Sequence, residues 1–291
     1  MAKEAWYRWG KSDERGAFNL ADAACTCAAA ALVRTGRVIS LAQPLSARTP
    51  VPAPRAGLMH LMNRDGGDYA AGAKRPDGFQ FAEDTLVLAT HTGTHIDALC
   101  HVWYDDELYN GFSCHSIRST SGAAHCGVDK LGPIVTTGIL FDVMRHRDRP
   151  LALGEAISAS DLQRCVDKSV LGRLAGAAVL IRTGWLEAYG ADADAYFKGE
   201  PGIDEDAALW LAESGVAVIG ADNFAIEPLP FPAGRVFPVH KRLLRDFGIP
   251  LIEGLQLKEL GEASVTQFLF AAAPLPVVGA TASPLSPIAV L

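Results

Sequence analysis

Three histidines and one aspartate fall within eleven residues of this 291-residue chain: His91, His95, Asp97 and His101. Imidazole nitrogens and carboxylate oxygens bind divalent transition metals, and donor sets without thiolates are more typical of catalytic than of structural zinc sites. A bound ion of this kind lets water act as a nucleophile at neutral pH. The segment therefore predicts a metal site, against the alternative of histidines that fall close together by chance.

The spacing of the four residues constrains the local conformation. All four occupy odd positions, so they would share one face of an extended strand. A straight strand would separate His91 from Asp97 by roughly 20 Å, which is too far for ligands of one ion. The chain must bend, and Gly93 provides the backbone freedom. A helix would join His91 to His95, but Thr-Gly-Thr is poor helix material.

A second carboxylate in the later half of the chain is a further ligand candidate. In an expected strand over residues 249–255, Glu253 is in register with apolar Leu251 and Leu255. This pattern places Glu253 on an inward face, where an unpaired carboxylate would cost several kcal/mol. A metal ion would neutralise it. The alternative is an exposed strand face with a solvated glutamate.

His240 is a fourth histidine that the pattern places in the interior. On an expected helix over residues 239–247 it shares a face with Leu243 and Leu244, whereas Arg245 points away with the other basic residues. A lone buried histidine is more often a hydrogen-bonded core residue than a ligand, so the pattern alone leaves both interpretations open.

The motif His-x-Gly-Thr-His-x-Asp-x-x-x-His strongly resembles the signature of the cyclase-like metal-dependent hydrolases, the family of bacterial kynurenine formamidase and isatin hydrolase. Further segments match the family in order, at residues 9–17, 180–185, 220–222, 240–244 and 251–255. Two features depart from the family pattern. Leu99-Cys100 stands where many members have a proline before the third histidine, and the chain is longer than typical formamidases.

The resemblance implies roles for these residues. His91, His95 and Asp97 are expected to hold a first ion, which Glu253 reaches from the later strand. The ion is expected to be Mn²⁺ or Zn²⁺. Thr94 is a candidate for orienting water or substrate.

The resemblance leaves His101 two roles. In one-metal members its counterpart acts as acid or base over the attacked carbonyl, and in two-metal members it binds a second ion together with residues matching His240 and Glu253. Histidine suits both roles, because its pKa near 6.5 allows proton exchange at neutral pH. The two departures from the family pattern favour one ion with His101 as the catalytic group. Two ions remain the alternative.

Hydrolysis of an amide-like C–N bond is the expected reaction, with a formyl anilide, lactam or cyclic imide as substrate. The alternatives are a lactone hydrolase, a cyclase or lyase that stabilises an enolate, and a non-catalytic metal-binding or ligand-binding protein. No Gly-x-Ser-x-Gly motif indicates a competing nucleophile. Trp103, Tyr104 and Phe112 follow the motif and are candidates for an aromatic wall around a flat substrate, or for ordinary packing.

Composition excludes several other classes. A net charge of −7 without a basic stripe argues against a nucleic-acid partner. No apolar run is long enough to span a bilayer, the first residues lack a secretion-signal pattern, and the six cysteines show no paired spacing. We therefore expect a cytoplasmic enzyme that acts on a small molecule without binding membranes. We also expect a homo-oligomer, either a dimer or a tetramer.

The elements that position these residues indicate an α/β protein. Apolar runs predict buried strands at residues 86–90, 139–143, 178–182, 216–220 and 265–270. Ser160 is a candidate N-cap, and a helix beginning after Asp204 should stop at Gly215. The resemblance implies one domain over residues 1–291, with an N-terminal arm and a compact β/β/α fold, of the swivelling-domain type, around a barrel-like mixed sheet. Residues 47–83 are rich in Pro and Gly and predict either an ordered loop near the site or a disordered excursion.

Overall fold

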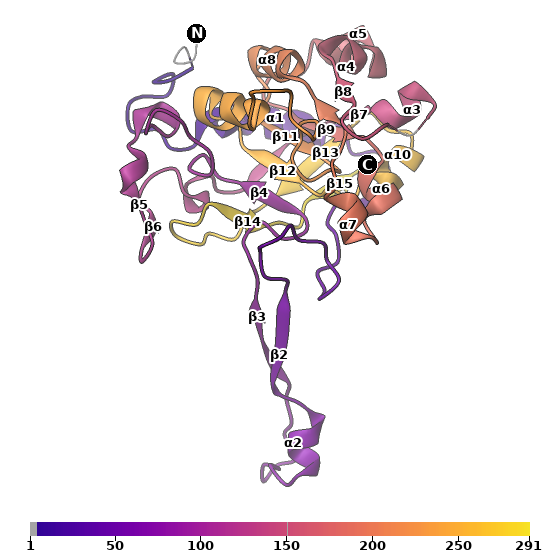
Figure 1. The fold of residues 1–291 in the computed structure, drawn as a ribbon. Coiled ribbons are helices and arrows are strands. Elements are labelled where there is room, and N and C mark those ends of the chain that lie inside the picture. Colours follow the sequence, from indigo (N-terminus) through magenta and orange to yellow (C-terminus); the bar gives the residue numbers. More distant parts are fainter. Residues whose placement is uncertain (1–4, 150) are drawn as a thin grey trace.

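The computed structural model describes residues 5–149 and 151–291, and its centre is a curled nine-stranded sheet (Figure 1). The strand order is β1-β15-β13-β7-β9-β11-β12-β4-β14. Four neighbouring central strands run parallel: β7 (Ile134–Asp142), β9 (Ala178–Arg182), β11 (Val218–Ala221) and β12 (Leu251–Glu253). Most of their side chains are buried, as expected for parallel strands covered on both faces.

Antiparallel strands complete the sheet on both sides. One side continues through β13 (Gln267–Ala272) and β15 (Ile288–Val290) to β1 (Val38–Ser40). On the other side, β4 (His95–Asp97) lies between β12 and β14 (Ala282–Pro284). The short strand that carries half of the histidine motif is thus held by two strands from the end of the chain.

Helices cover the sheet and support the later ligand candidates. Helix α1 (Ala23–Ala30) contacts β7 and β13, and α4 (Ala159–Cys165) packs against α8 (Glu205–Glu213). Helix α8 also packs against the π-helix η5 (Lys241–Phe247), which continues α9 (Pro238–His240). His240 lies at the junction of these two helices, so the packing of α8 fixes its position.

The remaining elements are short. The helices are η1 (Gly16–Leu20), α2 (Gly66–Ala70), η2 (Tyr109–Gly111), η3 (Cys114–Ser116), η4 (Val128–Lys130), α3 (Val143–Arg147), α5 (Lys168–Leu171), α6 (Trp185–Tyr189), α7 (Ala193–Tyr196) and α10 (Lys258–Glu262). Two-stranded pairs form between β5 (Ile117–Arg118) and β6 (Gly122–Ala123), and between β8 (Ala156–Ile157) and β10 (Gly202–Ile203). Within the described residues, no helix has both the length and the apolar character to cross a bilayer.

The expected α/β fold and most of its expected strands are confirmed, with two corrections. The run at residues 86–90 is not a buried strand, because β3 (Glu83–Val87) lies earlier and all of its residues are exposed. Ser158, rather than Ser160, caps α4, and its hydroxyl accepts from the backbone N–H of Asp161. The expected end of helix α8 is confirmed: its last residue is Glu213, and Gly215, which has a φ of +77°, directly follows the C-cap.

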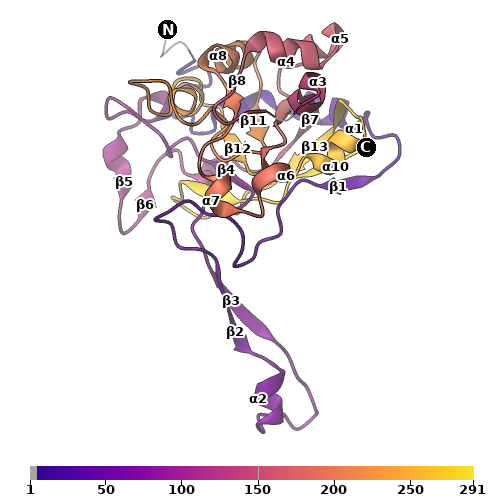
Figure 2. The same ribbon diagram turned by 45° about the vertical axis from the view of Figure 1, so that its right-hand side comes forward.

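The segment rich in Pro and Gly contains more regular structure than the sequence indicated. Strand β2 (Met59–Arg64) pairs with β3 in an antiparallel hairpin, and α2 lies at its tip. This projecting hairpin, residues 59–87, extends away from the body of the molecule in both views (Figures 1 and 2). The loop that precedes the hairpin returns to the body. There the guanidinium of Arg55 donates to the backbone oxygen of His91 at 3.3 Å.

Candidate metal centre

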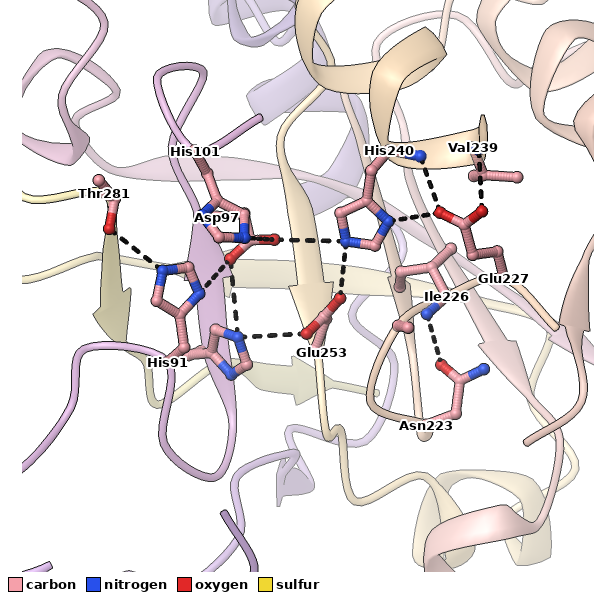
Figure 3. A network of polar contacts seen from close by, with 12 residues as sticks. His91, Asp97, His101, Asn223, Ile226, Glu227, Val239, His240, Glu253 and Thr281 are labelled. Atoms are coloured by element: carbon pink, nitrogen blue, oxygen red, sulfur yellow. Dashed lines mark hydrogen bonds and ion pairs between the residues drawn. The ribbon is translucent and has the colours of Figure 1, made fainter. Parts of the chain in front are cut away.

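The four residues of the motif converge because the chain bends before and after β4 (Figure 3). Gly93 has a φ of +61°, in the left-handed region that favours glycine, and this bend turns His91 back toward the strand. His95 and Asp97 alternate along β4 and therefore project from the same face. His101 follows in the turn after the strand. The expected combination of strand and bend is confirmed.

Strand pairing brings the later carboxylate to the motif. In the register of β12 with β4, Glu253 lies opposite His95 and Leu251 lies opposite Asp97. Glu253 is buried on the inward face, as its apolar neighbours predicted. The carboxylates of Asp97 and Glu253 are therefore both buried, and each lies near enough to feel the charge of the other.

One oxygen of each carboxylate points toward His95, and the same oxygen of Asp97 also contacts His91. Nδ1 of His91 lies 2.8 Å from Oδ1 of Asp97, and Nε2 of His95 lies 3.6 Å from the same oxygen. Nε2 of His95 is also 3.2 Å from Oε2 of Glu253. These contacts connect the four side chains.

The other oxygen of each carboxylate faces the remaining histidines. Nε2 of His240 lies 3.7 Å from Oδ2 of Asp97 and 3.2 Å from Oε1 of Glu253. Nε2 of His101 lies 3.9 Å from Oδ2 of Asp97, and its ring is tilted over that of His91, with 4.1 Å between centroids. The predicted burial of His240 is confirmed, and the structure brings it to the motif.

The donor atoms fit a metal site. Nε2 of His95 and both carboxylate oxygens of Asp97 are buried and have no hydrogen-bond partner among the described residues. Buried polar atoms without hydrogen bonds are costly, so three of them directed toward one region suit the binding of a cation. Two sets of three donors each lie within 4.8 Å of one another, and Asp97 belongs to both: His91, Asp97 and His101, and Asp97, His240 and Glu253.

Hydrogen bonds fix which ring nitrogen of each buried histidine faces the cluster. Nδ1 of His95 lies 2.9 Å from the backbone oxygen of Gly93, and Nδ1 of His240 lies 2.7 Å from Oε1 of Glu227. A histidine whose Nδ1–H is bound in this way presents the lone pair of Nε2, which is the arrangement that metal ligands adopt. In both residues Nε2 is the atom that approaches the carboxylates.

Glu227 is a residue of this site that the sequence did not reveal. Its carboxylate is fully buried and also accepts the backbone N–H groups of Val239 at 3.1 Å and His240 at 3.0 Å (Figure 3). It thereby holds both the ring and the backbone of His240. Glu227 lies in a loop with no strand or helix periodicity, so its neighbours carried no signal of an inward position.

Charges within the cluster shift the pKa values of its members. Burial would lower the pKa of His240, but hydrogen bonds to Glu227 and Glu253 outweigh it and raise the value to about 10. Burial lowers the pKa of His101 to about 4, despite the attraction of Asp97. Burial would raise the pKa of Asp97, but the surrounding imidazoles hold it well below its usual range. Both carboxylates are thus prepared to bind cations.

Two of the three aromatic residues after the motif pack against side chains outside the cluster. The ring of Tyr104 stacks against Arg245 and its hydroxyl donates to Asp246, while Phe112 stacks on His125 at 4.3 Å and Trp103 is 41% exposed. The cavity beside the cluster is instead lined by three other rings, those of Tyr196, Phe197 and Phe224. This cavity measures about 10 Å³, so the rings form a wall rather than a closed substrate pocket.

Two further expectations change with the structure. The hydroxyl of Thr94 donates to the backbone oxygen of Gly254 at 2.6 Å and accepts from the N–H of Gln43, so it joins two backbone segments. Arg245 does not point away from the interior. It is 1% exposed and lies between the rings of Trp6 and Tyr104, because the wider turns of the π-helix η5 rotate it inward.

Comparisons with known proteins agree with this geometry. Residues 39–228 match the Cyclase family model, described as "Putative cyclase". The curated kynurenine formamidase of Geobacillus thermodenitrificans (strain NG80-2) is 29% identical over 201 residues, which cover 69% of this chain and 76% of the relative. A crystal structure of "a novel cyclase" is 35% identical and superposes with a TM-score of 0.90, covering 98% of this chain and 99% of the other.

A more distant structure shares the fold. Isatin hydrolase A from Ralstonia solanacearum is 24% identical and has a TM-score of 0.63, with 87% of this chain and 91% of that chain covered. The family model covers well over half of the chain, and its match begins before the histidine motif and ends after Glu227. The chain therefore belongs to the Cyclase family.

Proposed function

We propose that this protein is a metal-dependent hydrolase of amide-type C–N bonds, with two divalent ions bound at the cluster around Asp97. One observation carries the proposal. Asp97 and Glu253 each direct one oxygen toward His95 and the other toward His240. A pair of carboxylates placed in this way suits two neighbouring cations, so the geometry favours the two-ion alternative over the single ion that the two departures from the family pattern favoured.

The donor types narrow the choice of metal, and the contacts between the histidines and the two carboxylates suggest where each ion would bind. Imidazole nitrogens and carboxylate oxygens suit Mn²⁺ and Zn²⁺, and we propose one of these as the cofactor. His91 and His95 would hold one ion, and His101 and His240 would hold the other. Asp97 and Glu253 would contribute to both positions. Two dications would also neutralise carboxylates that are costly to bury together.

The chain's own groups prepare the site for hydrolysis. When bound, a divalent ion supplies a Lewis acid that polarises a carbonyl group and generates a nucleophile from water at neutral pH. Burial keeps His101 neutral at that pH, so one of its ring nitrogens presents a lone pair to a cation or to a proton. The side chain of His101 is 26% exposed, more than those of His91, His95 and His240, and it marks the side from which substrate enters.

Two observations support a proposal for the substrate class. The named relatives are a kynurenine formamidase and an isatin hydrolase, and we infer an amide-like bond in this chain's substrate as well. Tyr196, Phe197 and Phe224 provide flat apolar surfaces beside the cluster, which favour an aromatic small molecule.

The test combines metal analysis with a substrate panel. We expect about two ions per chain in the purified protein. We also expect turnover of at least one formyl anilide, isatin, cyclic imide or lactone in ¹⁸O-labelled water, with label in the product. His95→Ala should lose both metal and turnover, whereas His146→Ala, a matched change at an exposed histidine, should lose neither. Turnover that survives complete removal of metal would contradict the proposal, and unlabelled product would indicate a cyclase or lyase.

A further inference from the structure

A second group of metal-binding side chains lies outside the cluster around Asp97. Asp106, Cys114 and His115 each offer one donor atom, and the three atoms lie within 4.8 Å of one another. The thiol of Cys114 donates to Oδ1 of Asp106, with 3.6 Å between the sulfur and the oxygen. A carboxylate, a thiol and an imidazole thus meet on one short stretch of chain.

The backbone of this stretch brings the three donors together. The N–H of Cys114 donates to the backbone oxygen of Asp106 at 3.0 Å, and an isolated antiparallel bridge joins Glu107 to Ser113. The hydroxyl of Ser113 accepts from the N–H of His115 at 3.2 Å and caps the short helix η3, to which Cys114 and His115 belong. The positions of the donors are therefore set by a folded loop and not by the chance orientation of long side chains.

No basic side chain of the described residues competes for these donors. Asp106 forms no ion pair with a described Lys or Arg, and the ring of His115 has no hydrogen-bond partner among the same residues. Arg245, which contacts the same loop, is already paired with Glu107 and Asp246. The carboxylate and the imidazole are thus both available to a cation.

The donor types select among metals. Thiolate sulfur together with imidazole nitrogen and carboxylate oxygen suits Zn²⁺, whereas Mn²⁺ prefers oxygen donors. Ligand atoms bound to zinc at about 2.0–2.3 Å in a tetrahedron lie about 3.3–3.8 Å apart, so donors within 4.8 Å need to approach by about 1.5 Å at most. Asp106 and His115 are exposed, so their side chains are free to make this movement.

We propose that Asp106, Cys114 and His115 form a zinc site that is separate from the metal centre around Asp97. Three protein ligands leave the fourth position of a tetrahedral ion to water. When zinc binds, the S–H bond of Cys114 breaks, a zinc–sulfur bond forms and the proton passes to solvent. Because two of the ligands are exposed, we expect this ion to exchange readily and the site to fill when zinc is supplied.

The location of the site indicates what the ion would do. The loop of the three ligands leaves the metal centre after His101, and β5, which follows η3 directly, lies at the left edge of the body in both views (Figures 1 and 2). Between the ligands, Glu107 binds the guanidinium of Arg245 on η5 at 3.0 Å. Zinc would close this loop at its outer end and hold it against the helix that continues from His240.

The experiment uses Co²⁺ as a probe of sulfur ligation. A thiolate bound to Co²⁺ gives an intense charge-transfer absorption in the near ultraviolet, which nitrogen and oxygen ligands do not give. The ligands proposed around Asp97 include no cysteine, so this absorption reports the second site alone. We expect it to appear when the reduced, metal-free protein is titrated with CoCl₂, to saturate at about one thiolate-bound ion per chain, and to disappear when ZnCl₂ is added.

Four variants locate the absorption. Cys114→Ser should abolish it, and His115→Ala should weaken Co²⁺ binding about tenfold or more, because one ligand is lost. Cys27→Ser, a matched change at an exposed cysteine on α1, should behave as wild type. His95→Ala, which alters the metal centre, should also keep the absorption. The titration needs no substrate, so its outcome is independent of the proposed hydrolase reaction.

Four results would overturn the proposal. They are a wild-type protein without the absorption, a Cys114→Ser protein that keeps it, a His95→Ala protein that loses it, and a Cys27→Ser protein that loses it to the same extent as Cys114→Ser. The third result would place the sulfur ligand in the metal centre, and the fourth would indicate adventitious binding by exposed thiols. If Cys114→Ser fails to fold, His115→Ala, a change at an exposed residue, decides the matter, and wild-type affinity in that variant would then contradict the site.

Discussion

Glu227 offers a sharp test of the proposed two-ion site, because its carboxylate binds the ring of His240 and the backbone N–H groups of Val239 and His240. In Glu227→Gln the side chain keeps its size and one oxygen, which can still accept from Nδ1 of His240. The amide group must then face the N–H of Val239, so two donors meet where a carboxylate oxygen now accepts at 3.1 Å. The variant loses the charge of a buried acceptor without opening a cavity.

The size of the effect follows from these contacts. A hydrogen bond to a charged group contributes about 1.5–3 kcal/mol, and losing a carboxylate behind a metal-binding histidine typically costs about 10–100-fold in affinity. Because His240 faces one side of the cluster, we expect the affinity for one of the two ions to fall by this factor. The ion beside His91 and His95 should keep its affinity.

Competition titration with a metal chelator measures the two affinities separately. Glu213→Gln, the same change at an exposed position on α8, is the matched control and should behave as wild type. The reasoning would be refuted if a folded Glu227→Gln protein bound both ions within twofold of wild type. An equal loss of affinity for both ions would also contradict it, because Glu227 would then affect both metal positions and not that of His240 alone.

Three further predictions concern the cluster itself. His101→Ala should reduce the metal content from two ions to one, and two retained ions with lost turnover would instead assign His101 to proton transfer. Metal content should fall in the order wild type, Glu253→Gln, Glu253→Ala, since glutamine keeps one oxygen donor; equal loss in both variants would mean that charge alone matters. The raised pKa of His240, about 10, means that the metal-free protein holds a proton there at pH 8. Metal binding should therefore release protons, which calorimetry in buffers of different ionisation enthalpy detects, and metal affinity should rise with pH up to about 10. In the metal-free protein that proton's contribution to stability should be complete below about pH 6.5 and lost as the pH rises through about 10, as urea unfolding at several pH values would show.

The sequence predicted the parts of the site that follow from local spacing and periodicity. His91, His95, Asp97 and His101 lie close together in the chain, so the bend at Gly93 and the turn after β4 suffice to bring them together. The inward position of Glu253 followed from its alternation with apolar neighbours, and the structure confirms its burial.

Other residues could not be placed in this way, for physical reasons. Arg245 was expected on the outer face of a helix with 3.6 residues per turn, but the π-helix changes the spacing and buries its guanidinium beside Glu107 and Asp246. Glu227 and the ring of Phe224 lie in a loop, where no period relates neighbouring side chains. Their positions depend on contacts with other segments of the chain, such as the hydrogen bond that the backbone N–H of His240 donates to the carboxylate of Glu227.

The sequence did not predict the hairpin, because its composition is typical of a loop. Its strands are short and separated by a tip rich in glycine and charge, so the segment resembled a loop. The pairing of Met59 with Val87 across this tip becomes evident only once the two strands are seen together.

The place of β4 in the sheet has a consequence for the synthesis of the protein. Both of its neighbours, β12 and β14, lie more than half of the chain later, and β14 ends only a few residues before the C-terminus. Until residues 251–284 have been synthesised, β4 has neither of the strands that it pairs with, and His95 and Asp97 lack Glu253. The proposed metal site can therefore form only after that segment has left the ribosome. A chain that ended before residue 251 would leave the histidines of the motif exposed as an unselective chelator.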